Sequence, residues 1–252
     1  MDWSAQLALL AASLVANVFS AFAGGGAGLL QLPIIIFLGL PFGVALATHK
    51  IATVALGVGA TVRHWREGSF DRKFTLVILC AGVPGVALGA SFILLVPGRT
   101  AEVALGMITL ALGAYSYLRP SLGQSVEPIN RDVRGLLAGS AVIFLVGLFN
   151  GSLSSGSGLF LTLWLVRWFG LDYRRAVAYT MVLGGMFWNG TGALTLVLLG
   201  DVRWSWLPAL LLGALVGGYL GAHLSILKGN RWIKRVYEAV TVAMGVSLIW
   251  GL

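Results

Sequence analysis

The second half of the chain repeats a pattern found in the first half. Residues 24–28 read GGGAG, and residues 154–158, about 130 positions later, read SSGSG. The correspondence continues with 39–41 against 170–172 and with 85–90 against 217–222. In a membrane chain, a duplication of this size favours a transporter, because duplicated helix bundles place one substrate site at their interface.

The composition shows that this is a membrane chain. Hydrophobic residues make up 58% of it and charged residues only 10%, with a mean hydropathy of +0.91. A helix needs about 20 residues to cross the hydrocarbon layer, and most of the apolar segments reach that length. β-Barrel strands would instead alternate polar and apolar residues. We therefore predict an all-α polytopic membrane protein with segments at roughly 5–23, 27–40, 44–62, 74–96, 101–118, 133–150, 157–170, 176–199, 205–227 and 233–251.

The second segment of each copy is too short for an ordinary span. Residues 27–40 and 157–170 are each 14 residues long, which corresponds to about 21 Å of helix. Each follows a break rich in glycine or serine. We expect the first two segments of each copy to form a Gly/Ser-tipped helical hairpin that stops short of the far surface. Two ordinary spans with a shallow tip are the alternative, and both versions return the chain to its starting side.

The basic residues set the orientation. When the segments are followed in order, 14 of the 17 basic residues fall on one side of the membrane. That side is cytoplasmic by the positive-inside rule, so both termini are predicted outside the cytoplasm, in a bacterial inner membrane. The residues on the crowded side are Arg63, Arg66, Arg72, Lys73, Arg119, Arg131, Arg134, Arg167, Arg174, Arg175, Lys228, Arg231, Lys234 and Arg235.

Five segments in each copy give the two copies opposite orientations. The first copy, residues 1–118, starts outside, and the second copy, residues 133–252, starts inside. A polar stretch with two prolines, residues 119–132, is predicted to connect them in the cytoplasm. Such inverted repeats suit alternating access, because exchanging the conformations of the two halves turns an inward-open form into an outward-open one.

The charge pattern also limits the partners. The pI near 10.2 is explained by topology and by anionic lipid headgroups, and the chain has no basic domain for nucleic acid. Cys80 is the only cysteine, so neither an internal disulfide nor a metal cluster is expected. All nine carboxylates fall at or near segment ends, which disfavours cation transport and a metal site. No cofactor is predicted.

Lys50 is the one fixed cation expected within a membrane segment, about six residues into the third segment. It is a candidate counter-charge for an anionic substrate, and a lysine that extends outward to the membrane surface is the alternative. The matching residue in the second copy is Met181. Its neighbour His49 is a candidate proton carrier, with a packing role as the alternative.

The Gly/Ser breaks place two helix N-termini inside the membrane. Free backbone N–H groups and the positive end of the helix dipole there suit sulfonate, sulfite, carboxylate or phosphate. Glycine serving only a tight turn is the alternative. Besides His49 and Lys50, the candidate substrate-binding residues are Gly25, Gly26, Ala27, Gly28, Gln31, Ser154, Ser155, Gly156, Ser157, Thr180 and Asn189. Glycines spaced by four at Gly85/Gly89 and Gly213/Gly217/Gly221 are assigned to close helix packing.

The glycine motif and the residues after it resemble a known family. Residues 24–28, Leu32-Pro33, the Gly39-Leu40-Pro41 turn and residues 45–48 (ALAT) are similar to the TauE/SafE sulfite-exporter family, and 156–158 with 176–178 match its repeat. The resemblance covers nearly the whole chain. It implies a plasma-membrane transporter of small anions, often sulfur-containing, that frequently exports them. The second copy departs from the pattern, with serine for glycine and no proline matching Pro33.

The sequence therefore predicts a secondary transporter, not an enzyme, that moves sulfite, sulfoacetate or a related organosulfonate by alternating access and exports it. The alternatives are an anion channel, a membrane subunit of a larger complex and, least favoured, an intramembrane hydrolase, which is suggested by Ser154, Ser155, His49 and His223. Proton coupling and a homodimeric assembly stay open. Membrane lipids are expected around the bundle.

Overall fold

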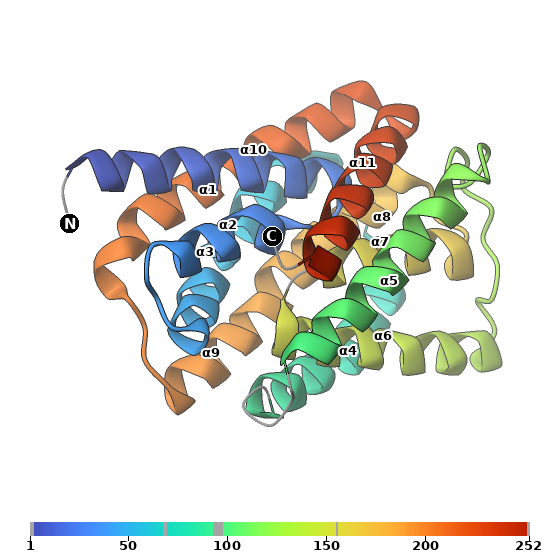
Figure 1. Cartoon of the computed structure of the whole chain (residues 1–252). Coiled ribbons are helices and arrows are strands. Elements are labelled where there is room, and N and C mark those ends of the chain that lie inside the picture. Colours follow the sequence, from blue (N-terminus) through green and yellow to red (C-terminus); the bar gives the residue numbers. More distant parts are fainter. Residues whose placement is uncertain (1–2, 68–69, 93–97, 155, 251–252) are drawn as a thin grey trace.

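The protein is an all-helical bundle, as predicted (Figure 1). The computed structural model describes residues 3–67, 70–92, 98–154 and 156–250, and no strand occurs among them. Six helical segments of this described part are long and apolar enough to cross a membrane. They are α1 (Trp3–Ala23), α3 (Phe42–His64), α4 (Arg72–Phe92), α6 (Val133–Leu153), the combined segment Tyr173–Leu199, and Trp204–Lys228, which contains η4 (Trp204–Trp206) and α10 (Leu207–Lys228).

The last helix of each copy differs from these six. Helix α5 (Gly98–Tyr117) has 20 residues and α11 (Asn230–Trp250) has 21, yet neither belongs to the six. In α11 the reason is charge in the first half of the helix. There Lys234 pairs with Glu238, and both bond to Ser116 of α5. The two helices pack against each other.

The short second segments form helices that begin at the predicted residues. Helix α2 (Ala27–Phe37) has 11 residues and α7 (Ser157–Phe169) has 13, about 16 and 20 Å of helix. Their N-caps, Gly26 and Gly156, have φ values of +103° and +77°, a left-handed conformation that glycine adopts without a steric cost. Each short helix packs on the helix before it, α2 on α1 and α7 on α6, so each copy opens with a hairpin.

The third segment of the second copy is built in three parts. They are α8 (Tyr173–Tyr179), η3 (Thr180–Trp188) and α9 (Asn189–Leu199). The middle part, η3, is a π-helix of nine residues, whereas its counterpart α3 is a regular α-helix that continues into η1 (Trp65–Glu67). π-Helical turns are rare and are often found at functional sites.

The two halves pack through reciprocal pairs of helices. Helix α1 lies along α10, and its counterpart α6 lies along α4 (Figure 1). The predicted glycine rows lie in both contacts: Gly213, Gly217 and Gly221 approach backbone oxygens of Leu10, Leu14 and Val18 in α1, and Gly85 and Gly89 approach those of Phe144 and Leu148 in α6. Small residues thus let the helix backbones come close, as their spacing predicts.

Hydrogen bonds near the helix ends also join distant segments. Asn230, at the start of α11, donates to the Gln124 carbonyl (3.0 Å) and to Asp172 (3.2 Å). Gln6 of α1 donates to the carbonyl of Ser205 in η4 (3.0 Å). The predicted linker, residues 119–132, lies in the non-helical stretch between α5 and α6. The inverted orientation of the copies and the side that faces the cytoplasm stay predictions.

Candidate functional site

The tips of the two hairpins touch in the interior of the bundle. Thr162 of α7 donates to the Gly24 carbonyl at 2.9 Å. A Cβ atom on Gly25 would lie 2.5 Å from the backbone nitrogen of Leu159, so only glycine allows the first tip to approach the start of α7 this closely. As a result, the N-terminal ends of α2 and α7 are neighbours.

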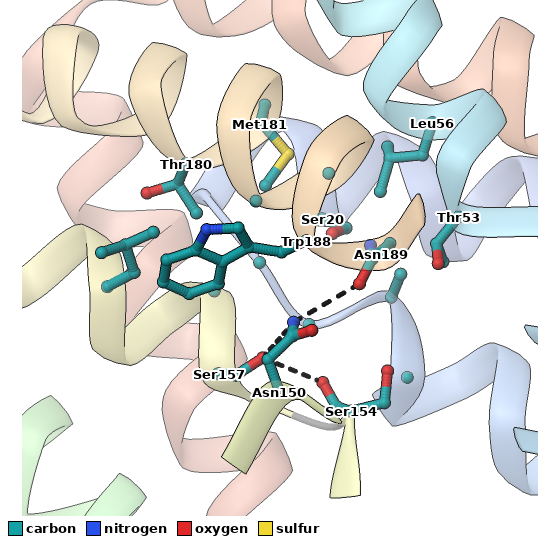
Figure 2. A pocket seen from close by; sticks show the side chains of 18 of the residues that line it. Ser20, Thr53, Leu56, Asn150, Ser154, Ser157, Thr180, Met181, Trp188 and Asn189 are labelled. Atoms are coloured by element: carbon teal, nitrogen blue, oxygen red, sulfur yellow. Dashed lines mark hydrogen bonds between the residues drawn. The ribbon is translucent and has the colours of Figure 1, made fainter. Parts of the chain in front are cut away.

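A small polar cavity lies where these tips meet α3 and η3 (Figure 2). Its volume is about 40 Å³, and since one water needs about 10–15 Å³, it has room for a few waters or a group of that size. The residues that line it come from both copies. They are Ser20, Gly25, Gly26, Ala27, Gly28, His49, Thr53, Leu56, Asn150, Ser154, Ser157, Gly158, Leu161, Thr180, Met181, Gly184, Gly185, Trp188 and Asn189.

Most of the residues predicted from the sequence meet at this cavity. Gly25, Gly26, Ala27, Gly28, His49, Ser154, Ser157, Thr180 and Asn189 all line it. Gly156 caps α7 and lies against Met244. Ser155 lies outside the described residues.

Gln31 is buried away from the cavity, between the two helices of the first hairpin. Its Oε1 accepts a hydrogen bond from Asn17 (3.2 Å), and its Nε2 donates to Ser13 Oγ (3.3 Å). Ser13 donates in turn to the Leu210 carbonyl of α10 (2.7 Å). Gln31 therefore ties α2 to α1, and Ser13 ties α1 to α10.

Lys50 is fully buried and points into the bundle. Its Nζ lies 2.6 Å from the Asn150 carbonyl oxygen, 2.7 Å from Asn150 Oδ1 and 3.1 Å from Asn189 Oδ1. Lys50 does not itself line the cavity, but both of its partners do. The Lys50 ammonium is therefore separated from the cavity by the two asparagines that it contacts. It lies where α3 of the first copy meets α6 and α9 of the second.

Sequence reasoning missed Asn150, Ser20 and Trp188 as lining residues. The repeat carries the signal for two of them, because Ser20 and Asn150 occupy the same position in the two copies, six residues before Gly26 and Gly156. Their pairing shows that the cavity is built from equivalent positions of both halves. The repeat gives no such signal for Trp188, because the residue at the matching position of the first copy is Gly57.

The π-helix contributes one wall of the cavity. Lining residues recur along it in pairs every four positions, at 180 and 181, 184 and 185, and then 188 with Asn189 just beyond. On the opposite wall α3 contributes His49, Thr53 and Leu56. The two helices cross closely at Gly57 and Gly185, where a Cβ atom on Gly57 would lie 2.4 Å from the Gly185 carbonyl carbon.

Two buried polar atoms of the lining residues have no hydrogen-bond partner in the described part of the chain. They are Nδ1 of His49 and Nε1 of Trp188. Buried polar groups in proteins are nearly always paired, so such atoms point to a water or a ligand. None of the described lining residues is acidic, and no cluster that could hold a metal occurs among the described residues.

A helical membrane bundle with a small polar cavity where two half-length helices meet is the architecture of a membrane transporter. Comparison with known proteins gives the family. The family Sulfite exporter TauE/SafE matches residues 9–248, and the chain belongs to it.

Similar proteins from several bacteria are named only as transporters. A probable membrane transporter protein of a Sinorhizobium species is 28% identical over 96% of this chain and 91% of its own. One of Haemophilus influenzae is 26% identical over 96% and 93%. One of Escherichia coli is 27% identical over 94% and 87%. No solved structure matches the chain.

Proposed function

We propose that this protein is a secondary transporter of small, sulfur-containing anions such as sulfite, sulfoacetate or a related organosulfonate. It binds them at the cavity between the hairpin tips and exports them across the bacterial inner membrane by alternating access. The observation that carries the proposal is a buried lysine bound to two lining asparagines, at a cavity whose described lining contains no acidic residue.

The electrostatics of the cavity favour a negative ligand. A buried charge is costly without an opposite charge, and the described contacts of the Lys50 ammonium are all to neutral oxygens. An anion in the cavity would supply the missing negative charge. The N-termini of α2 and α7, which begin at the cavity, add backbone N–H groups and the positive ends of their dipoles.

The size of the cavity favours a small head group. About 40 Å³ fits a compact oxyanion group better than a large organic body. Serine and threonine hydroxyls of the lining, such as Ser157 and Thr180, offer further donors to oxyanion oxygens. The same groups suit a carboxylate or phosphate, so the preference for sulfur is inferred from the family.

The hydrolase alternative finds little support in the geometry. A serine nucleophile needs a histidine within hydrogen-bond reach. In the described part of the chain His49 Nδ1 has no partner, and His223 Nδ1 accepts from Arg63 Nε at 3.0 Å. Neither ring is paired with Ser154.

The test is uptake into proteoliposomes of purified protein. We expect saturable transport of at least one of sulfite, sulfoacetate, taurine, thiosulfate and sulfate, above that of protein-free vesicles, together with counterflow of the same anion. Counterflow requires alternating access, so flux without counterflow would indicate a channel. No flux of any of the five compounds would contradict the proposal.

A further inference from the structure

We propose that Asn189 donates its side-chain amino group to the transported anion and that Lys50 is the positioning residue that turns it that way. This inference rests on the proposed function, because it assigns roles within the same cavity. It differs from a direct contact between the anion and Lys50, which does not line the cavity.

The first step of the argument is the direction of the hydrogen bonds. A lysine ammonium only donates, whereas an asparagine amide presents an oxygen at one end and an amino group at the other. Lys50 Nζ lies 2.7 Å from Asn150 Oδ1 and 3.1 Å from Asn189 Oδ1. Both amides must therefore turn their oxygens to Lys50, and their amino groups point away from it.

The second step is to follow the two amino groups. That of Asn150 donates to Ser157 Oγ at 2.9 Å and more weakly to Asn189 Oδ1 at 3.4 Å (Figure 2). Ser157 then donates to the Ser154 carbonyl at 3.2 Å. The amino group of Asn189 donates to no protein atom in the described part of the chain.

The third step is location. Asn189 lines the cavity at the end of the π-helix. Its oxygen is already taken by Lys50 and Asn150, so a donor is what it can offer. A hydrogen bond from a cation to the amide oxygen polarises the amide and strengthens its amino group as a donor. Lys50 thus acts on the anion through Asn189.

Asn189→Asp keeps the shape and the contact with Lys50 and removes the donor, but it also adds a negative charge beside the anion, so only an unchanged apparent KM is decisive for this variant. Asn189→Leu, which has nearly the same shape and no charge, removes the donor without that repulsion and is measured beside it. The proposal predicts that the apparent KM for the best anion of the panel rises roughly ten- to hundredfold. Thr191→Val is the control, since Thr191 donates to the Phe187 carbonyl and does not line the cavity. It should transport as wild type does.

A double-mutant cycle tests the positioning role of Lys50. Asn189→Ala should raise the apparent KM at least tenfold in the wild-type background, but change it by less than about twofold in a Lys50→Met background, where the amide is no longer oriented. Lys50→Gln, which keeps a donor to the asparagine oxygens, should fall between wild type and Lys50→Met. If Lys50→Met does not fold, the cycle is run with Lys50→Gln, and the cost of Asn189→Ala should still shrink.

The outcomes separate this inference from the proposed function. Wild-type protein that moves none of the five compounds of the panel overturns the proposed function. Wild-type protein that transports, together with an Asn189→Asp variant of unchanged apparent KM, overturns only the role of Asn189. An equal cost of Asn189→Ala in both backgrounds overturns the positioning role of Lys50. Anion-dependent shifts of the melting temperature in detergent give a second readout, because a ligand that binds the folded state stabilises it.

Discussion

Helix α3 and the segment α8–η3–α9 are counterparts in the two copies, and they differ in both charge and shape. Helix α3 is a continuous α-helix of 23 residues that carries His49 and Lys50. Its counterpart is π-helical over nine residues and carries Thr180 and Met181 at the matching positions. The first helix thus supplies the cation, while the second supplies the widened wall and Asn189.

This difference shows how a duplicated scaffold becomes an asymmetric site. The reciprocal packing of α1 with α10 and of α6 with α4 is shared by the copies, as are the glycine N-caps of α2 and α7. The charged and amide side chains at the cavity are not shared. Packing positions have therefore been kept alike in the two halves, while the residues that face the ligand have diverged.

The largest effect is expected from removing the charge of α3. Lys50→Met should lower apparent affinity for the best anion by roughly ten- to hundredfold, since a lost charge-assisted interaction costs about 1.5–3 kcal/mol. Lys50→Arg should keep part of the activity, because a planar guanidinium does not replace a compact ammonium. Uptake assays on folded protein measure both, with Cys80→Ser, at an exposed position of α4, as the control. If Lys50→Met bound the anion with wild-type affinity, Lys50 would have no part in substrate binding.

The next effect concerns the crossing of α3 with η3. Gly57→Ala places a Cβ atom 2.4 Å from the Gly185 backbone, so it should destabilise the protein by about 1–3 kcal/mol. Gly43→Ala on the same helix meets nothing within 4 Å and should not destabilise it, because alanine favours a helix. Melting temperatures in detergent compare the pair. Equal melting temperatures would show that the two helices are not in close contact.

A smaller effect on the apparent KM is expected at the hairpin tips, and it should differ between the two tips. Ser157→Ala removes the acceptor of the Asn150 amino group and should raise the apparent KM by roughly two- to tenfold, as for a neutral hydrogen bond of about 0.5–1.5 kcal/mol. Ala27→Ser adds a hydroxyl at the matching position of α2 and should change the apparent KM less. If the two variants lost affinity equally, the tips would contribute alike and the proposed asymmetry would be wrong.

The smallest effect is expected at the ion pair between the copies. Glu67 accepts from Arg63 at 3.1 Å and also pairs with Arg174 of α8. The hydrogen bond from Arg63, with the nearby charge of Arg174, lowers the pKa of Glu67. The stabilisation from this ion pair is thus fully present above the pKa that Glu67 has in the unfolded chain. It is lost as the pH falls through the lowered pKa that Glu67 has in the folded protein.

Glu67→Gln should accordingly cost less than about 1 kcal/mol, since the pair is partly exposed. Melting temperatures of the variant and the wild type should converge in acid. A gap that widened as pH fell would contradict this account of the pair.

The sequence predicts the parts of the structure that depend on local chemistry. Apolar length and the Gly/Ser breaks predict the starts of α2 and α7, and glycines spaced by four predict the close helix contacts. The π-helix was not predictable, because its residues, 180–188 (TMVLGGMFW), are apolar apart from Thr180 and so show no polar–apolar period that would distinguish a π-helix from an α-helix. Lys50 could be predicted from the sequence, because a charged residue within a membrane segment is rare. Its asparagine partners were harder to find, since Asn150 is 100 residues away from it and Asn189 is 139 away.

The central claim is that the two copies are inverted around one shared cavity, and cysteine labelling from the two sides of the membrane tests it most directly. Single cysteines in a Cys80→Ser background react with an impermeant thiol reagent from the side they face. Positions Arg66, Ser125 and Arg231 should label only from the cytoplasm, and positions Arg99 and Arg203 only from outside. Labelling of positions 125 and 99 from the same side would contradict the inverted arrangement.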